Sequence, residues 1–148
     1  MTIKSKNKQK QPYAGIFRRL FALFYDWFLL LALLFTTTAI FNAINHGIAI
    51  ESGNNLYIPL IMTLLAITFF FFTWFWVHGG QTLGLKTWRC RVCDTNGGNI
   101  SWRQATIRFL VAIISTFTLG IGFLWSLFHK NRKTWHDIAS KTQLIDLR

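Results

Sequence analysis

Residues 18–30 read RRLFALFYDWFLL, and this stretch decides how the rest of the chain is interpreted. Two arginines, Arg18 and Arg19, come directly before an apolar run, and a carboxylate, Asp26, lies inside it. An ionised carboxylate at the centre of a membrane-spanning helix costs about 2.5–3.5 kcal/mol on insertion scales, so such residues generally face a partner, a bundle interior or water. We therefore expect another part of the fold to shelter Asp26.

Two apolar blocks are long enough to cross a bilayer as helices. The block around Asp26 extends over 22 residues, from Leu20 to Phe41, and a second block of 22 residues, Leu56 to Val77, contains no charged side chain. About 20 helical residues cross the hydrocarbon core of a membrane. Only 14% of the 148 residues are charged, compared with about 25% in soluble domains. The sequence therefore predicts a membrane protein with two full transmembrane helices.

The positive charges are segregated along the chain. All sixteen Lys and Arg residues lie within residues 1–19, 86–108 and 130–148, whereas the segment 42–55 between the two blocks holds none. The positive-inside rule then places the N-terminus in the cytoplasm and 42–55 outside. This segregation excludes a simple basic nucleic-acid-binding domain. Residues 1–12 are predicted to form a disordered basic tail near anionic lipid, and 13–148 a single membrane domain.

The third apolar block, Phe109 to Phe128, has 20 residues and two interpretations. Leu119-Gly120-Ile121-Gly122 lies at its middle, where a helix can break and turn back. A straight crossing would export the basic residues that follow the block, against the charge bias. We expect a broken, re-entrant helical segment, with three straight spans as the alternative.

Short strands are expected on the cytoplasmic side. WRCRVCD at 88–94 and TQLIDL at 142–147 have strand character, and Asn96-Gly97-Gly98-Asn99 is a turn sequence. The predicted fold is an all-α integral membrane protein with a small cytoplasmic β-hairpin over 88–101 and a C-terminal strand paired with it. Cys90 and Cys93 lie in the first strand without the second ligand pair that a zinc site needs, so no metal site or cofactor is predicted.

A cluster of charged residues is expected at the inner membrane face. Arg19 and Asp26 are seven residues apart, on nearly one helical stripe and about 10.5 Å apart along the axis. We expect Arg19 to hold Asp26, through water or a third residue, together with residues returning from the third block. The predicted cluster is Arg19, Asp26, Arg108, His136 and Asp137. Its role is either structural, as buried ion pairs, or functional, with Asp26 binding a proton or cation and His136 relaying protons.

Three stretches of the chain resemble the RDD family of membrane proteins. These stretches are AGIFRRLFALFYD at 14–26, GGQTLGLKTWRCRVCD at 79–94 and RKTWHDIASKTQLI at 132–145. The resemblance implies that Arg19, Asp26 and Asp137 are the arginine and two aspartates after which the family is named. It places the remaining family motif residues at Gly80, Gln81, Thr82, Gly84 and Thr142. It also implies a multi-pass protein of the bacterial inner membrane, with a suggested role in ion transport.

Two functions follow as expectations. The first is cation or proton transport as a homo-oligomer or transporter subunit, with Asp26 as the titrating group. The second is a non-catalytic accessory, assembly or lipid-interacting membrane protein, whose basic face binds anionic lipid head groups. No catalytic residues are predicted and an enzyme is not expected, because the sequence contains no nucleophile motif, phosphate-binding loop or metal-ligand set.

Overall fold

The apolar run around Asp26 folds as one helix, α1 (Ile16–Ile44), in the computed structural model, which describes residues 12–118 and 120–148. The helix has 29 residues and exceeds the predicted span at both ends. Thr36, Thr37 and Thr38 do not interrupt it, because each hydroxyl donates to the carbonyl four residues earlier at 2.8–2.9 Å. The predicted tail covers residues 1–12. Residues 1–11 lie outside the described residues, so this prediction is not tested there.

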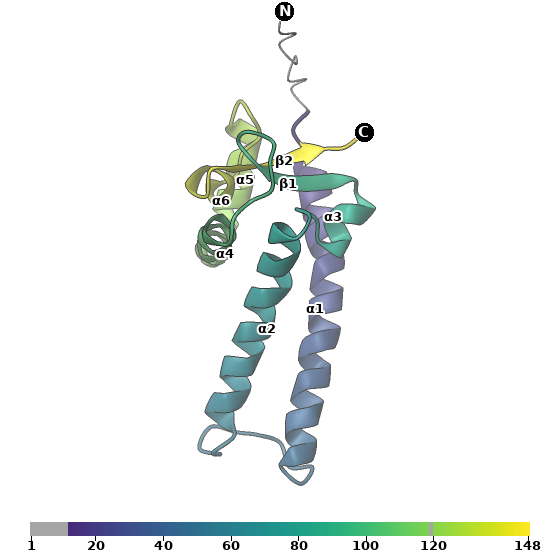
Figure 1. Ribbon diagram of the computed structural model, residues 1–148. Coiled ribbons are helices and arrows are strands. Elements are labelled where there is room, and N and C mark those ends of the chain that lie inside the picture. The colour runs from purple at the N-terminus through teal and green to yellow at the C-terminus, as the bar shows by residue number, and fades with distance from the viewer. Residues whose placement is uncertain (1–11, 119) are drawn as a thin grey trace, which may run out of the picture.

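The second apolar block forms α2 (Tyr57–Val77), which returns antiparallel to α1 (Figure 1). Together the two helices make a stem. Within residues 12–118 and 120–148, α1 and α2 are the two unbroken helices that are long and apolar enough to cross a membrane. This confirms that both predicted blocks form helices of membrane-spanning length.

The third apolar block is broken, as its glycines predict. It forms α4 (Trp102–Phe117) and α5 (Ile121–Phe128), which meet at an angle of 99°. Gly120 lies between them with φ +77°, a left-handed conformation that favours glycine. A Cβ on Gly122 would lie 2.2 Å from Ser115 Oγ, so the absence of a side chain there lets α5 pack closely against α4. The block is not one straight helix.

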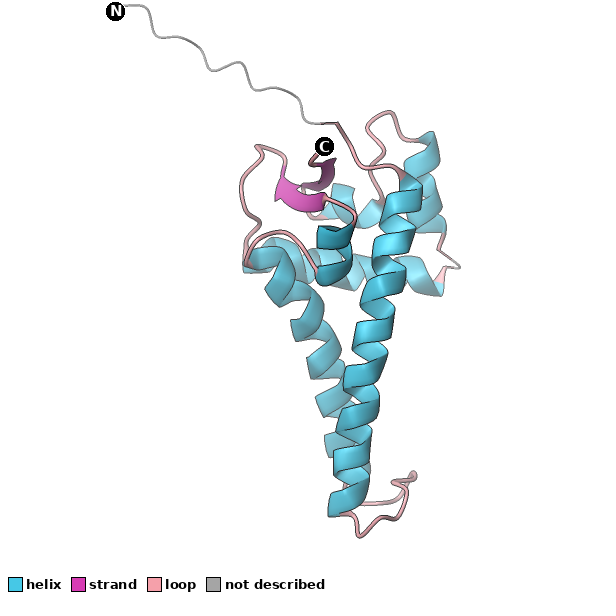
Figure 2. Cartoon of the chain, turned by 90° about the vertical axis from the view of Figure 1, so that its right-hand side faces the viewer, coloured by secondary structure: helices cyan, strands magenta, loops and turns pink. Residues whose placement is uncertain are grey.

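The helix α4 lies across the axis of the stem. It is seen end-on in Figure 1 and from the side after the quarter turn of Figure 2. Its first turn is fixed by a capping box, in which the Ser101 hydroxyl accepts from Gln104 N and the Gln104 side chain accepts from Ser101 N. The third apolar block thus belongs to a head at one end of the stem.

Two strands pair in the head, but the predicted hairpin does not form. β1 (Cys90–Asp94) pairs antiparallel with β2 (Thr142–Asp146), with Val92 opposite Leu144, which confirms the predicted C-terminal strand. The turn after Asp94 closes with a Gly97 N to Asp94 O bond of 3.1 Å, yet the chain then enters α4 instead of a returning strand. The capping box at Ser101 starts a helix where a second hairpin strand would have to continue.

The short helices α3 (Leu83–Thr87) and α6 (Trp135–Ala139) complete the head. The core that they cover comprises Ala14, Ala22, Trp76, Leu85, Cys90, Val92, Ile100, Ala105 and Leu144. Cys90 and Cys93 are both buried as free thiols. The N-terminal segment is attached to the same sheet, because Tyr13 forms an isolated bridge with Ile145.

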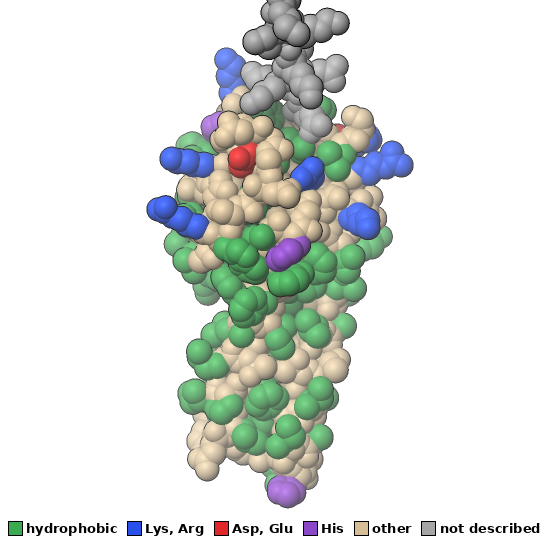
Figure 3. Space-filling view, viewed as in Figure 1, with side chains coloured by type: hydrophobic (Ala, Val, Ile, Leu, Met, Phe, Trp, Pro, Cys, Tyr) green, Lys and Arg blue, Asp and Glu red, His purple; other side chains and the backbone are tan. Residues whose placement is uncertain are grey.

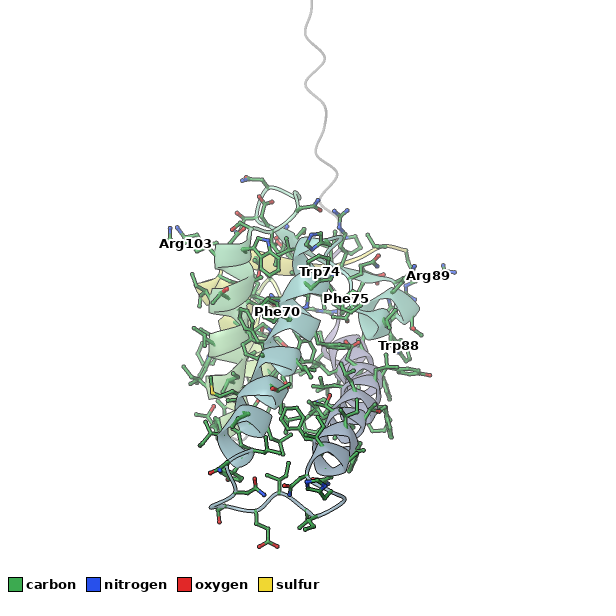
Figure 4. The ribbon with its side chains drawn as sticks, turned by 60° about the horizontal axis from the view of Figure 1, so that its bottom comes forward. Phe70, Trp74, Phe75, Trp88, Arg89 and Arg103 are labelled. Carbon is green, nitrogen blue, oxygen red and sulfur yellow. The ribbon has the colours of Figure 1, made fainter. Side chains whose placement is uncertain are left out.

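The surface is divided between an apolar stem and a basic head. Figure 3 shows Lys and Arg side chains around the head, whereas hydrophobic side chains dominate the visible face of the stem. Arg89 and Arg103 project from opposite sides of the head in Figure 4. This distribution suits a stem that is embedded in lipid and a head that meets lipid head groups and water.

Candidate functional site

Asp137 is the centre of the buried charge cluster. It is the third residue of α6, where its carboxylate accepts from Thr134 N at 3.1 Å while the Thr134 hydroxyl accepts from Asp137 N. The same carboxylate accepts from Arg19 Nη1 at 2.7 Å and from Arg108 Nη1. Asp137 therefore joins the first helix of the stem to α4 and α6 of the head.

Both arginines are fixed by further contacts. Arg19 Nη2 donates to the carbonyl oxygen of Arg132 at 3.0 Å. Arg108 Nη1 also donates to the Thr142 hydroxyl at 2.7 Å, and its guanidinium carbon lies 5.1 Å from the centroid of a Trp76 ring. The two arginine side chains are only 4–5% exposed. Removing one partner of such a buried pair strongly destabilises a fold, because the other charge is left buried and unpaired. The presence of the pair alone does not indicate catalysis.

The surroundings of the cluster set the charges of its members. Burial alone would raise the pKa of Asp137, but the positive charges of Arg19 and Arg108 outweigh burial and hold that pKa far below the usual range of a carboxyl group. Burial lowers the pKa of His136 to about 3, with a further contribution from Arg108. The carboxylate is therefore ionised and the imidazole neutral at pH 7.

His136 lies against this cluster without a complete set of partners. Its Nε2 is 3.9 Å from Asp137 Oδ1, and its ring centroid is 4.9 Å from that of Phe123. Its Nδ1 is buried and has no hydrogen-bond partner among the described residues. No chain of described acceptors leads away from this nitrogen, so the proton relay predicted for His136 has no visible next step.

Asp26 is held by a different part of the chain from the one expected. Its carboxylate accepts from the Thr82 hydroxyl at 2.5 Å and from Gly84 N at 2.8 Å, and the residue is only 2% exposed. The prediction that Arg19 holds Asp26 is wrong, since Arg19 bonds to Asp137 and to the Arg132 carbonyl. Residues of the third block do not bond to Asp26 in the described part of the chain either.

The glycines of the 79–84 segment explain how it reaches α1. A Cβ on Gly84 would lie 2.0 Å from Ala22 O and 3.0 Å from Asp26 Cγ, so only glycine permits this approach of α3 to α1. Gly80 has φ +72°, and a Cβ there would lie 2.1 Å from Val92 O. Gln81 bridges to the same strand through a 2.8 Å bond from its side-chain amide to Cys90 O. This segment therefore connects α1 to β1.

The two aspartates thus hold different parts of the head against α1. Asp26 attaches α3 to the stem, and Asp137 attaches α4 and α6 to it. The structure brings Arg19, Arg108, His136, Asp137 and Thr142 together and places Asp26 with Thr82 and Gly84. Sequence reasoning missed these partners of Asp26, although Thr82 is the N-cap of a helix whose exposed N–H groups suit a nearby carboxylate.

Both sites border one cavity of about 960 Å³ between the stem and the α4–α5 pair. Its lining is largely apolar, and the polar residues on it are Arg19, Asp26, Thr68, Thr82, Arg108, Thr116 and His136. The described residues contain no group of three or more His, Cys, Asp or Glu side chains placed to hold a metal ion.

The fold and site define a small helical membrane protein whose stem and head are joined by buried Arg–Asp contacts. A model of the RDD family matches residues 13–141, which is most of the chain, and the protein therefore belongs to the RDD family. No curated protein matches the chain significantly, and no solved structure does so either.

Proposed function

We propose that this RDD-family protein takes part in moving protons or small cations across the bacterial inner membrane, as a homo-oligomer or as a subunit of a transporter. The observation that carries the proposal is Asp26, a carboxylate on a membrane-spanning helix that borders a cavity and forms no ion pair with a described cation. Carboxylates in such positions commonly bind the ions that transporters move.

The proposed orientation has the head in the cytoplasm. It is supported by the Lys and Arg side chains around the head and by the segment 42–55, which has none at the opposite end of the stem. In this orientation α4 and α5 enter the inner leaflet from the cytoplasmic side without crossing it. Two helices cannot enclose a pathway, so transport requires further copies or a partner protein.

Flux measurements on Asp26→Asn test the proposal. The asparagine oxygen can still accept from Gly84 N and its amide can donate to the Thr82 oxygen, so the tether survives while the titrating group is lost. Protein reconstituted in vesicles should show cation-dependent proton flux in the wild type and none in this variant, with equal insertion. Equal flux in both proteins, or none in the wild type, would refute the proposal.

Two control variants separate transport from tethering. Thr82→Ala removes the hydroxyl that Asp26 accepts from but keeps the carboxylate, so it should retain flux with an altered pH dependence. Glu51→Gln removes an exposed carboxylate from the loop between α1 and α2 and should leave flux unchanged. If Asp26→Asn and Thr82→Ala lower folded yield equally and flux per folded molecule is constant, then Asp26 is only a tether.

The basic surface of the head favours a second candidate, a non-catalytic accessory protein that interacts with anionic lipid. Several Lys and Arg side chains project from the visible face of the head, above the hydrophobic side chains that lead into the stem (Figure 3). Each basic residue near an anionic membrane surface contributes about 1 kcal/mol to attraction. Purified protein should then retain anionic phospholipid or copurify with a larger membrane complex, and a lipid-free, monodisperse protein that transports ions would contradict this candidate.

A further inference from the structure

The cavity between the stem and the α4–α5 pair has the size of a small-molecule site. Its volume of about 960 Å³ lies near the upper end of the roughly 300–1,000 Å³ range of such sites. Five helices contribute apolar walls, among them Leu23 and Leu30 of α1, Phe69 and Phe72 of α2, and Ile113 of α4. A wall of this kind suits an apolar chain.

One end of the cavity is polar and incompletely satisfied. Arg19, Arg108 and His136 all line it, and each is at least nine-tenths buried. The Nε atoms of both arginines and Nδ1 of His136 have no hydrogen-bond partner among the described residues. A buried polar group without a partner costs about 1–3 kcal/mol, so this end of the cavity is incompletely satisfied. These nitrogens are inaccessible as placed, so the attraction of this end for a ligand comes from the charge of the guanidinium groups.

The charge at this end favours an anion. Two guanidinium groups, those of Arg19 and Arg108, share the single carboxylate of Asp137, which leaves one positive charge in excess within this described cluster. Asp26 also borders the cavity, but it is about 10.5 Å further along α1, and its oxygens are bonded to Thr82 and Gly84. An anionic group near the arginines would therefore balance the cluster without displacing Asp26.

The cavity is open at the apolar surface of the stem. Trp27 of α1 and Leu65 of α2 belong to the lining and are 56% and 60% exposed. Molecules that reach this opening in a membrane come from the hydrocarbon core and carry long apolar chains.

We infer that this cavity binds one amphipathic anion from the membrane, with its carboxylate or phosphate head at Arg19, Arg108 and His136 and its acyl chain between α1, α2 and α4. A free fatty acid and the acyl chain of an anionic phospholipid share this chemistry. The site does not use the Asp26 carboxylate, and it differs from lipid attraction to the outer surface of the head because its ligand lies within the cavity and is bound in a fixed ratio.

The test is competition for radiolabelled palmitate on purified wild-type protein in a neutral detergent. Bound palmitate should saturate at one molecule per chain. Unlabelled palmitate should compete at least tenfold better than hexadecanol, which has the same chain and no charge. Dioleoyl phosphatidylglycerol distinguishes a free fatty acid from an anionic phospholipid as the ligand. Strong competition by this lipid identifies a phospholipid site, and weak competition identifies a fatty-acid site.

Two cavity-filling variants locate the site. Ala112 and Thr116 line the cavity on α4, so Ala112→Phe and Thr116→Phe should each weaken palmitate binding at least tenfold. Ala39→Phe is the matched control, because Ala39 is exposed on α1 and does not line the cavity. Thermal unfolding of each variant shows whether it is folded.

Each outcome decides the inference. Saturable binding that prefers the anion and is lost in the folded α4 variants supports it. Equal competition by palmitate and hexadecanol, or non-saturable uptake, overturns it through the wild type alone, even if both α4 variants fail to fold. Unchanged binding in the folded α4 variants, or an equal loss in Ala39→Phe, overturns it as well.

Discussion

Replacing Asp137 with asparagine tests whether the buried charge cluster holds the head on the stem. The carboxylate accepts from Arg19, Arg108 and Thr134 N, and it is fully buried. An asparagine of equal size keeps one acceptor oxygen but turns an amide donor toward a guanidinium group. Two cations then share a site that holds no described carboxylate.

The expected loss is large because the remaining charges stay buried. Breaking a buried pair by removing one partner costs about 3–5 kcal/mol. For a chain of this size, 1 kcal/mol corresponds to about 2–4 °C in the midpoint of thermal unfolding, so Asp137→Asn should lower the midpoint by roughly 6–20 °C. Thermal unfolding of purified protein in detergent, followed by tryptophan fluorescence, measures this shift.

Asp146→Asn provides the matched control. Asp146 pairs with Arg18 and Arg148 near the surface of the head, with 12% of its side chain exposed, and such pairs contribute about 0–1 kcal/mol. Adding Arg108→Gln to Asp137→Asn should restore part of the lost stability, since it removes an unpaired charge. A shift for Asp137→Asn no larger than that for Asp146→Asn would refute the reasoning, as would further destabilisation in the double variant.

Three further predictions concern the contacts of the head. Gly84→Ala should lower stability by about 1–3 kcal/mol and reduce folded yield, because its Cβ would lie 2.0 Å from Ala22 O, while Gly98→Ala should be tolerated with its nearest atom at 3.5 Å; equal thermal midpoints would contradict this. Gly122→Ala should destabilise the α4–α5 bend through its 2.2 Å approach to Ser115 Oγ, and Ser115→Gly should rescue it in a double-variant thermal unfolding cycle. Burial lowers the pKa of His136 to about 3, so between pH 6.5 and 3 the imidazole is protonated in the unfolded state but neutral in the folded state. The free energy of unfolding should therefore decrease as the pH falls from 6.5 to 3, by up to about 1.4 kcal/mol per pH unit. His136→Gln should flatten the unfolding midpoint between pH 6 and 4, and an unchanged slope would show that another group titrates there.

The general architecture followed from simple patterns in the sequence. Hydrophobic length gave α1 and α2, and the glycines around position 120 gave the break between α4 and α5. The pairing of β1 with β2 followed from two short strand-like segments. These features depend on local composition, which one sequence displays directly.

The partners of the charged residues were harder to predict because they depend on contacts between distant segments. Arg19 and Asp137 are 118 positions apart, and Asp26 and Thr82 are 56 apart. Helical spacing brought Arg19 and Asp26 onto one stripe, but a separation of two turns favours no direct bond. Arg19 instead bonds to Asp137 at the start of α6, and Asp26 bonds to Thr82 at the start of α3.

The hairpin prediction failed for a reason that the sequence does contain. The Asn96–Asn99 turn forms, but Ser101 and Gln104 have the spacing of a capping box and start a helix directly afterwards. A helix start signal within a few residues of a turn therefore outweighs the turn signal in this segment.

The distance along the chain between Arg19 and Asp137 has a consequence for biosynthesis. During translation the first membrane helix emerges with its arginine and aspartate long before β2 and α6 exist. Arg19 therefore stays without its carboxylate partner until α6 has been made near the end of the chain, whereas Asp26 can bond to Thr82 and Gly84 as soon as α3 has been made. The contact between Arg19 and α6 is consequently one of the last to form, and a chain without its C-terminal segment would leave the Arg19 guanidinium without its carboxylate.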